Sequence, residues 1–102
     1  MVFIELPVFT RLVGYYLTDD EYQALQIYLI RHPDAGAVIP GAKGLRKLRW
    51  MSAAKGKRSG VRIIYYWITR NNQIIMLTIY KKSAQDDLTK NQLKQLMEYL
   101  EP

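Results

Sequence analysis

Hydrophobic and polar positions recur with two different periods along the chain, and these periods predict its helices and strands. Residues 2–5 are apolar and partly β-branched, which is typical of a short strand. Pro7 follows and suits the first turn of a helix. The next apolar residues recur at the spacing of one helix face: Phe9, Leu12, Val13 and Tyr16. The N-terminal part therefore predicts a strand followed by a helix.

A second helix is predicted to begin after Thr18. Thr18 and Glu21 have the spacing of a capping box, in which each side chain accepts a hydrogen bond from the other residue's backbone. The buried stripe of this helix is Tyr22, Leu25, Tyr28 and Leu29. We expect the helix to end near His32, because Pro33 restricts the residue before it. The two helices then form a helical hairpin.

Three strands are predicted over residues 45–51, 61–68 and 73–82, with a long polar loop over 52–60. In the first strand, Leu48 and Trp50 share one face while Lys47 and Arg49 share the other. Asn71 and Asn72 tolerate the left-handed backbone of a tight turn. The three strands are therefore expected to pair as an antiparallel meander.

The last element is predicted to be a helix capped by Thr89 and Gln92. Its apolar stripe is Leu93, Leu96, Met97 and Leu100. The order strand, two helices, three strands, helix indicates an α+β fold. We expect an antiparallel sheet with the two N-terminal helices and the C-terminal helix packed on one face, which leaves the other face open.

Composition fits a single globular domain over residues 1–102, since 49% of the residues are hydrophobic and 24% are charged. The formal net charge of +6 favours anionic partners. The sequence contains no cysteine, and it shows neither a signal peptide nor a membrane-spanning run. The protein is therefore expected in the cytoplasm, without a membrane partner.

Positive charge is concentrated between residues 43 and 62, where no Asp or Glu occurs. The cations are Lys43, Arg46, Lys47, Arg49, Lys55, Lys57, Arg58 and Arg62. Such a run repels itself, and a phosphate backbone opposite it would relieve the repulsion. A solvated basic hairpin is the alternative. Gly56, Ser59 and Gly60 are small enough for an extended ligand to approach the backbone.

The inventory of reactive side chains excludes several catalytic designs. Cysteine nucleophiles are absent, and the lone His32 suits a helix end better than catalysis. Neither a metal nor another cofactor is expected, because Asp86 and Asp87 are better explained by the N-terminus of the last helix. The lysines and arginines remain. Neighbouring charges can lower the pKa of a lysine, arginines can bind a phosphate, and RNA supplies its own 2′-hydroxyl nucleophile. Metal-free RNA cleavage is thus chemically possible.

Three segments resemble the HigB branch of the RelE/ParE toxin superfamily: residues 44–49, 55–66 and 77–82. The block Lys-Gly-Lys-Arg-Ser-Gly-Val-Arg-Ile-Ile-Tyr-Tyr is the most specific of them. The similarity spans nearly the whole chain in the same element order. It implies a microbial-RNase-type fold and a toxin of a type II toxin–antitoxin system. Such toxins cut mRNA in the ribosomal A site by 2′-hydroxyl attack, and translation stops.

The resemblance also assigns candidate site residues. The catalytic candidates are Lys55, Lys57, Arg62 and Lys82, and the RNA-binding candidates are Lys47, Arg49, Arg58, Tyr66 and Tyr80. Arg62 matches the family's phosphate-stabilising arginine, and Lys82 stands where RelE-type sequences have a further arginine. Leu88 stands where the RelE branch has a tyrosine. Either Tyr65, Tyr66 or Tyr80 replaces that tyrosine, or the protein works without one. The aromatic side chains can also be core residues.

The implied partners are the mRNA, the ribosomal A site and a cognate antitoxin of the helix-turn-helix type, which brings operator DNA to the complex. Two other functions stay open. One is a ParE-like toxin that inhibits gyrase, although the density of basic residues over 52–60 favours RNA. The other is a basic RNA- or ribosome-binding module that binds RNA without cleaving it.

Overall fold

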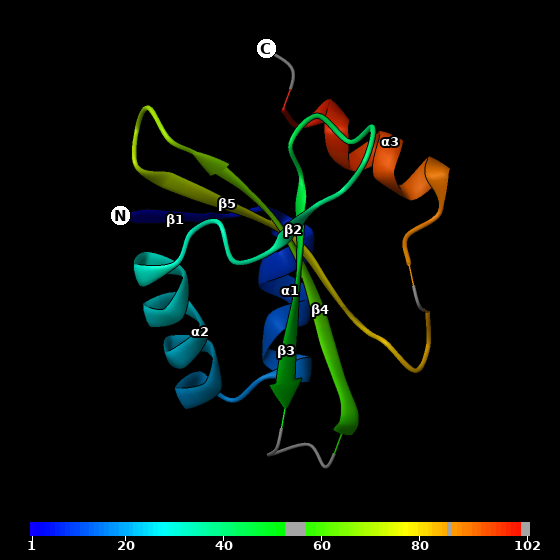
Figure 1. Ribbon diagram of the computed structural model, residues 1–102. Helices are drawn as coiled ribbons and strands as arrows, with labels where there is room; N and C mark the ends of the chain where they lie inside the picture. Colours follow the sequence, from blue (N-terminus) through cyan, green and yellow to red (C-terminus); the bar gives the residue numbers. More distant parts are fainter. Residues whose placement is uncertain (53–56, 86, 101–102) are drawn as a thin grey trace.

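The computed structural model describes residues 1–52, 57–85 and 87–100, with the backbone alone described for residues 52 and 57–59. Figure 1 shows the course of the chain. The elements are β1 (Val2–Glu5), α1 (Pro7–Tyr16), α2 (Asp19–Arg31), β2 (Ala37–Val38), β3 (Arg46–Ser52), β4 (Lys57–Ile68), β5 (Gln73–Lys81) and α3 (Lys90–Glu98). The predicted α+β order is confirmed, and the short strand β2 is added to it. The predicted loop over 52–60 was too long, because β3 reaches Ser52 and β4 starts at Lys57.

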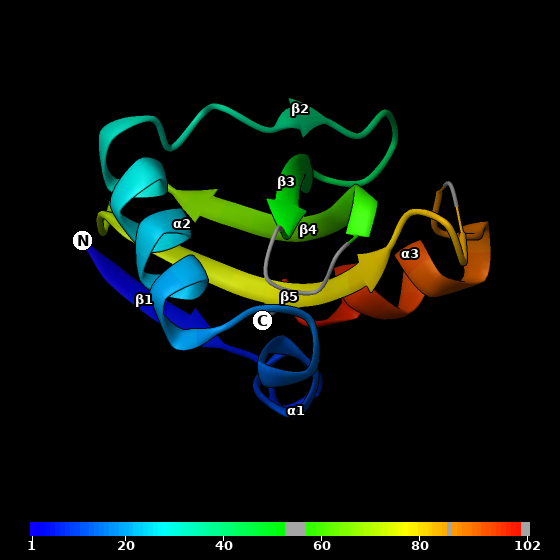
Figure 2. The same cartoon turned by 90° about the horizontal axis from the view of Figure 1, so that it is seen from below.

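The described strands form one mixed sheet in the order β1-β5-β4-β3-β2, which can be followed in Figure 2. The three long strands pair as the predicted antiparallel meander. The prediction of a wholly antiparallel sheet was wrong, because β1 runs parallel to β5. Between β1 and β5 the chain passes through α1, α2 and three further strands, which is long enough for the crossover that parallel pairing requires.

Helices cover both faces of this sheet, so the prediction that all three pack on one face was also wrong. Side chains alternate along β4. Val61, Ile63 and Tyr65 join the core formed with α1 and α2, while Ile64 joins the core formed with Leu96 of α3. In Figure 1, α2 and α3 lie at opposite sides of the molecule. The face expected to be open is therefore partly covered by α3.

Local signals set the ends of the helices as predicted. The backbone N–H of Glu21 donates to Thr18 Oγ1 at 3.1 Å, and the N–H of Thr18 donates to Glu21 Oε1 at 2.9 Å. Thr89 and Gln92 form the second capping box, at 3.1 and 2.8 Å. His32 is the C-cap of α2. These ends are fixed by neighbouring residues, which is why the sequence predicted them.

One buried tyrosine ties the segment after α2 to the sheet. The hydroxyl of Tyr65 donates to the carbonyl of Pro33 and accepts from the N–H of Gly36, both at 2.8 Å. Burial raises the pKa of Tyr65, which keeps this hydroxyl protonated. Arg46 Nη1 donates to the Gly36 carbonyl at 2.8 Å. These bonds hold β2 beside β3.

Replacing Tyr65 by Phe should lower the free energy of unfolding by about 1–3 kcal/mol, because a buried N–H and a carbonyl lose their partner. Urea unfolding followed by circular dichroism measures the change. The control is Tyr15→Phe, since Tyr15 is 73% exposed; it should change the value by less than about 0.5 kcal/mol. Equal effects of the two variants would show that the hydroxyl of Tyr65 does not anchor this segment.

Candidate active site

Three of the predicted site residues form one row across the sheet. Arg49 in β3 lies opposite Arg62 in β4, and Arg62 lies opposite Tyr80 in β5. Residues directly opposite in antiparallel strands project from the same face, with Cβ atoms roughly 4.5–5.5 Å apart. We call Arg49, Arg62 and Tyr80 the arginine row. Like charges placed directly opposite destabilise a sheet, so the row is suited to an anion that neutralises both.

Arg62 is the most confined of these charges, with only 5% of its surface exposed. Within the described part of the chain, its side chain makes one hydrogen bond, from Nη1 to the Val61 carbonyl at 3.4 Å. A buried charge is costly unless it is paired and hydrogen-bonded. An anion that reaches Arg62 would therefore relieve a larger cost than one bound by an exposed cation.

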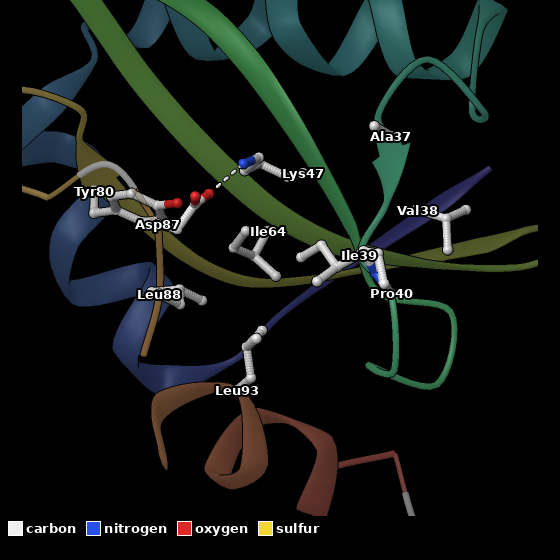
Figure 3. Close-up of a pocket in the computed structure, with 10 residues that line it drawn as sticks. All are labelled: Ala37, Val38, Ile39, Pro40, Lys47, Ile64, Tyr80, Asp87, Leu88 and Leu93. Atoms are coloured by element: carbon white, nitrogen blue, oxygen red, sulfur yellow. Dashed lines mark hydrogen bonds and ion pairs between the residues drawn. The ribbon is translucent and has the colours of Figure 1, made fainter. Parts of the chain in front are cut away.

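The next row along the same face is Lys47, Ile64 and Thr78. Lys47 Nζ donates to Asp87 Oδ1 in an ion pair, drawn as the dashed line in Figure 3. Asp87 lies in the connection between β5 and α3. The hydrogen bond from Lys47 lowers the pKa of Asp87, and the charges of Lys47 and Arg62 lower it further. Asp87 is therefore part of the electrostatics of the site.

A cavity of about 420 Å³ opens beside this ion pair. Figure 3 shows that its walls come from β2 and the following loop on one side and from Leu88 and Leu93 on the other. The lining residues are Ala37, Val38, Ile39, Pro40, Lys47, Ile64, Tyr80, Asp87, Leu88 and Leu93. The cavity is thus apolar with a charged rim, and it touches the arginine row at Tyr80.

The remaining basic candidates have different positions. Lys82 is exposed, and its backbone N–H donates to the Gly60 carbonyl at 3.4 Å, one pair beyond Val61 and Lys81. Lys57 and Arg58 belong to β4, but their side chains lie outside the described residues. Lys55 also lies outside the described residues. The predicted roles of these residues stay predictions.

The sheet separates one of the three candidate tyrosines, Tyr65, from the other two. The hydroxyl of Tyr65 is engaged by Pro33 and Gly36 in the core shared with α2. Tyr66 packs in the α3 core, as Tyr80 does, but it lies opposite Ile75, four residues along β4 from Arg62. Tyr80 alone among the three lies opposite Arg62. Among these three tyrosines, the register therefore places Tyr80 in the arginine row.

Gly60 has a structural explanation that replaces the one expected from the sequence. It has a φ of +70°, and a Cβ there would meet the Trp50 carbonyl oxygen at 2.6 Å. A side chain is therefore excluded by strand β3 itself. The glycine permits the close pairing of β3 and β4 next to the arginine row, rather than the approach of a ligand. Gly56 lies outside the described residues, as does the side chain of Ser59.

Asp87 is the site residue that sequence reasoning missed. The sequence predicts a role for Asp87 at the N-terminus of the last helix, but Thr89 caps that helix. The carboxylate of Asp87 instead pairs with Lys47, which is 40 residues away in the chain. Among the residues described, no three acidic or histidine side chains gather into a metal-binding group. Over the same residues, no helix has the length and apolar character needed to cross a bilayer.

The ion pair can be tested by titrating Asp87. Because the folded protein has a lowered pKa at Asp87, the ion pair adds its full stability above the unfolded-state pKa, near 3.8. That stability is lost as the pH falls through the lower pKa of the folded state. Replacing Lys47 by Met should raise the pKa of Asp87 towards 3.8 in carbon-detected NMR. The control Arg70→Met removes an exposed cation of the β4–β5 turn and should leave it unchanged. An unaltered pKa in Lys47→Met would contradict the pairing.

Comparison with known proteins bears on the fold. No protein-family model matches the chain. A chain of the E. coli RelBE toxin–antitoxin complex is similar over 78% of this chain and 94% of its own length, with 13% identity and a TM-score of 0.58. A mutant of E. coli toxin RelE in the free state matches over 97% of this chain and 95% of its own, with 13% identity and a TM-score of 0.56. The chain therefore has the α+β fold of the E. coli toxin RelE.

Proposed function

We propose that this protein is a RelE-like toxin of a type II toxin–antitoxin system, of the HigB branch, which cuts mRNA on the ribosome. The arginine row carries this proposal. Its two arginines and its tyrosine lie directly opposite one another and project from one face of a RelE-like sheet. The similarity to RelE supports the fold on which the row stands. The net charge of +6 supports an anionic substrate.

The proposed reaction needs little from the protein beyond charge and position. The 2′-hydroxyl of the RNA gives its proton to a base and its oxygen bonds to the adjacent phosphorus, while the bond to the 5′-oxygen breaks and an acid gives a proton to that leaving oxygen. Arg62, with Arg49 beside it, neutralises the non-bridging oxygens as charge develops on them. Tyr80 lies next to Arg62 and can move a proton. Lys55, Lys57 and Lys82 are the other acid–base candidates.

The proposed partners follow from the same reading. One of the similar solved structures is the intact E. coli RelBE toxin–antitoxin complex. We expect a cognate antitoxin here too, of the helix-turn-helix type, through which the complex reaches operator DNA. We expect the protein to bind its mRNA in the ribosomal A site, in the cytoplasm. Lys47 and Arg58, together with Tyr66, are the remaining RNA-binding candidates from the sequence.

The test compares wild type with Arg62→Ala in a cell-free translation reaction, with primer extension on the mRNA. Breaks inside the reading frame should appear with wild type and fall by roughly 100-fold or more with the variant, since one transition-state charge is lost. Arg62→Lys keeps the charge but loses the planar fork, and it should be intermediate. Thermal unfolding of each variant shows whether it has folded.

Arg70→Ala is the matched control, because Arg70 is an exposed arginine of the β4–β5 turn and should cleave as wild type does. Undiminished cleavage by a folded Arg62→Ala variant would remove Arg62 from the mechanism. Intact message combined with loss of DNA supercoiling would support the gyrase inhibitor instead. Salt-dependent RNA binding without breaks would support the binding module.

A further inference from the structure

The cavity beside the arginine row has the size and the apolar lining of a site for an aromatic ring. Ile39 and Pro40 face Leu88 and Leu93 across it (Figure 3), and Ile64 forms its base. Its volume of about 420 Å³ lies in the range of roughly 300–1,000 Å³ that is usual for small-molecule sites. Apolar side chains on opposite walls can pack against a ring and exclude water from it.

Its position ties it to the phosphate. Lys47, on the rim of the cavity, and Arg49, in the arginine row, project from the same face of β3. They are two residues apart, which is roughly 7 Å along a strand. Tyr80 contributes to both the row and the cavity lining. A nucleotide whose phosphate meets the arginines therefore places its own or the next base at the cavity.

The polar groups at the rim define which base fits. Lys47 offers N–H donors, and Asp87 offers carboxylate acceptors beside it. Within the described part of the chain, only Oδ1 of that carboxylate is engaged. The Watson–Crick edge of guanine has the complementary order: the O6 acceptor, then the N1–H and N2–H donors. Adenine, cytosine and uracil each turn at least one acceptor towards the carboxylate.

We propose that this cavity binds a guanine base of the RNA next to the phosphate held by the arginine row, with Asp87 and Lys47 reading its Watson–Crick edge. This inference rests on the proposed RNA substrate. It makes Asp87 a residue that determines specificity through direct contact with the base. A peptide of a protein partner is the competing occupant. It is disfavoured because the cavity adjoins a buried arginine that no carboxylate partners among the described residues.

The test is calorimetric titration of the whole chain with the 5′- and 3′-monophosphates of the four ribonucleosides. Guanosine monophosphate should bind roughly tenfold or more tightly than the others, as expected for a bidentate contact to a base edge. In Asp87→Asn one acceptor becomes a donor, so this preference should fall below about twofold. The variant should fold, because the side chain of Asp87 is 70% exposed.

Asp19→Asn is the matched control, since Asp19 begins α2 on the other side of the sheet and the variant should keep the guanine preference. Equal affinities for the four nucleotides, no binding of any, or a preference retained in Asp87→Asn would each overturn the proposal. The experiments distinguish failure of the base site from failure of the proposed cleavage reaction. Loss of guanine preference with mRNA cleavage intact removes only the base site, whereas guanine binding without cleavage removes only the proposed reaction.

Discussion

The site depends on one electrostatic constraint: two arginines face each other across neighbouring strands, and one of them is buried. The register of β3 and β4 imposes this pairing, since Arg49 lies opposite Arg62. Proximity of like charges and loss of hydration both oppose folding there. The apolar pairs on the rest of β4 offset that cost, because Val61, Ile63 and Tyr65 are fully buried on the other face. The sheet thus holds in place a positive site that an anion would stabilise.

The helix α3 and the connection before it give that site its shape. The α3 core takes in Ile64 and Leu77, and it extends to Tyr80, which lies opposite Arg62. The connection then returns past Lys47 and brings Asp87 and Leu88 to the cavity. The same few residues therefore hold α3 against the sheet and close one wall of the cavity. Asp87, negative beside the arginine row, also competes with any phosphate that approaches the Lys47 side of the site.

The sequence predicts the features that depend on residues close together in the chain. It misses the contacts that depend on residues far apart in the chain. Both capping boxes, the meander and the alternation of Leu48 with Lys47 depend on short spacings. The parallel pairing of β1 depends on Ile75 and Met76, far along the chain. The position of α3 did have a signal: a strand that is apolar at successive positions from Ile63 to Tyr66 needs cover on both faces. The pairing of Lys47 with Asp87 had none, because it joins two charges that are 40 residues apart in the chain.

The most direct measurement is NMR of the arginine side chains during titration with a 2′-O-methylated RNA oligonucleotide, which cannot be cleaved because its nucleophile is blocked. If the arginine row binds the backbone phosphate, the Nε–Hε signals of Arg49 and Arg62 shift together and saturate at the same RNA concentration. Arg11 in α1 and Arg70 in the β4–β5 turn are exposed, and their signals should stay in place. Shifts confined to Arg11 or Arg70, with Arg49 and Arg62 unmoved, would contradict a phosphate site on this row.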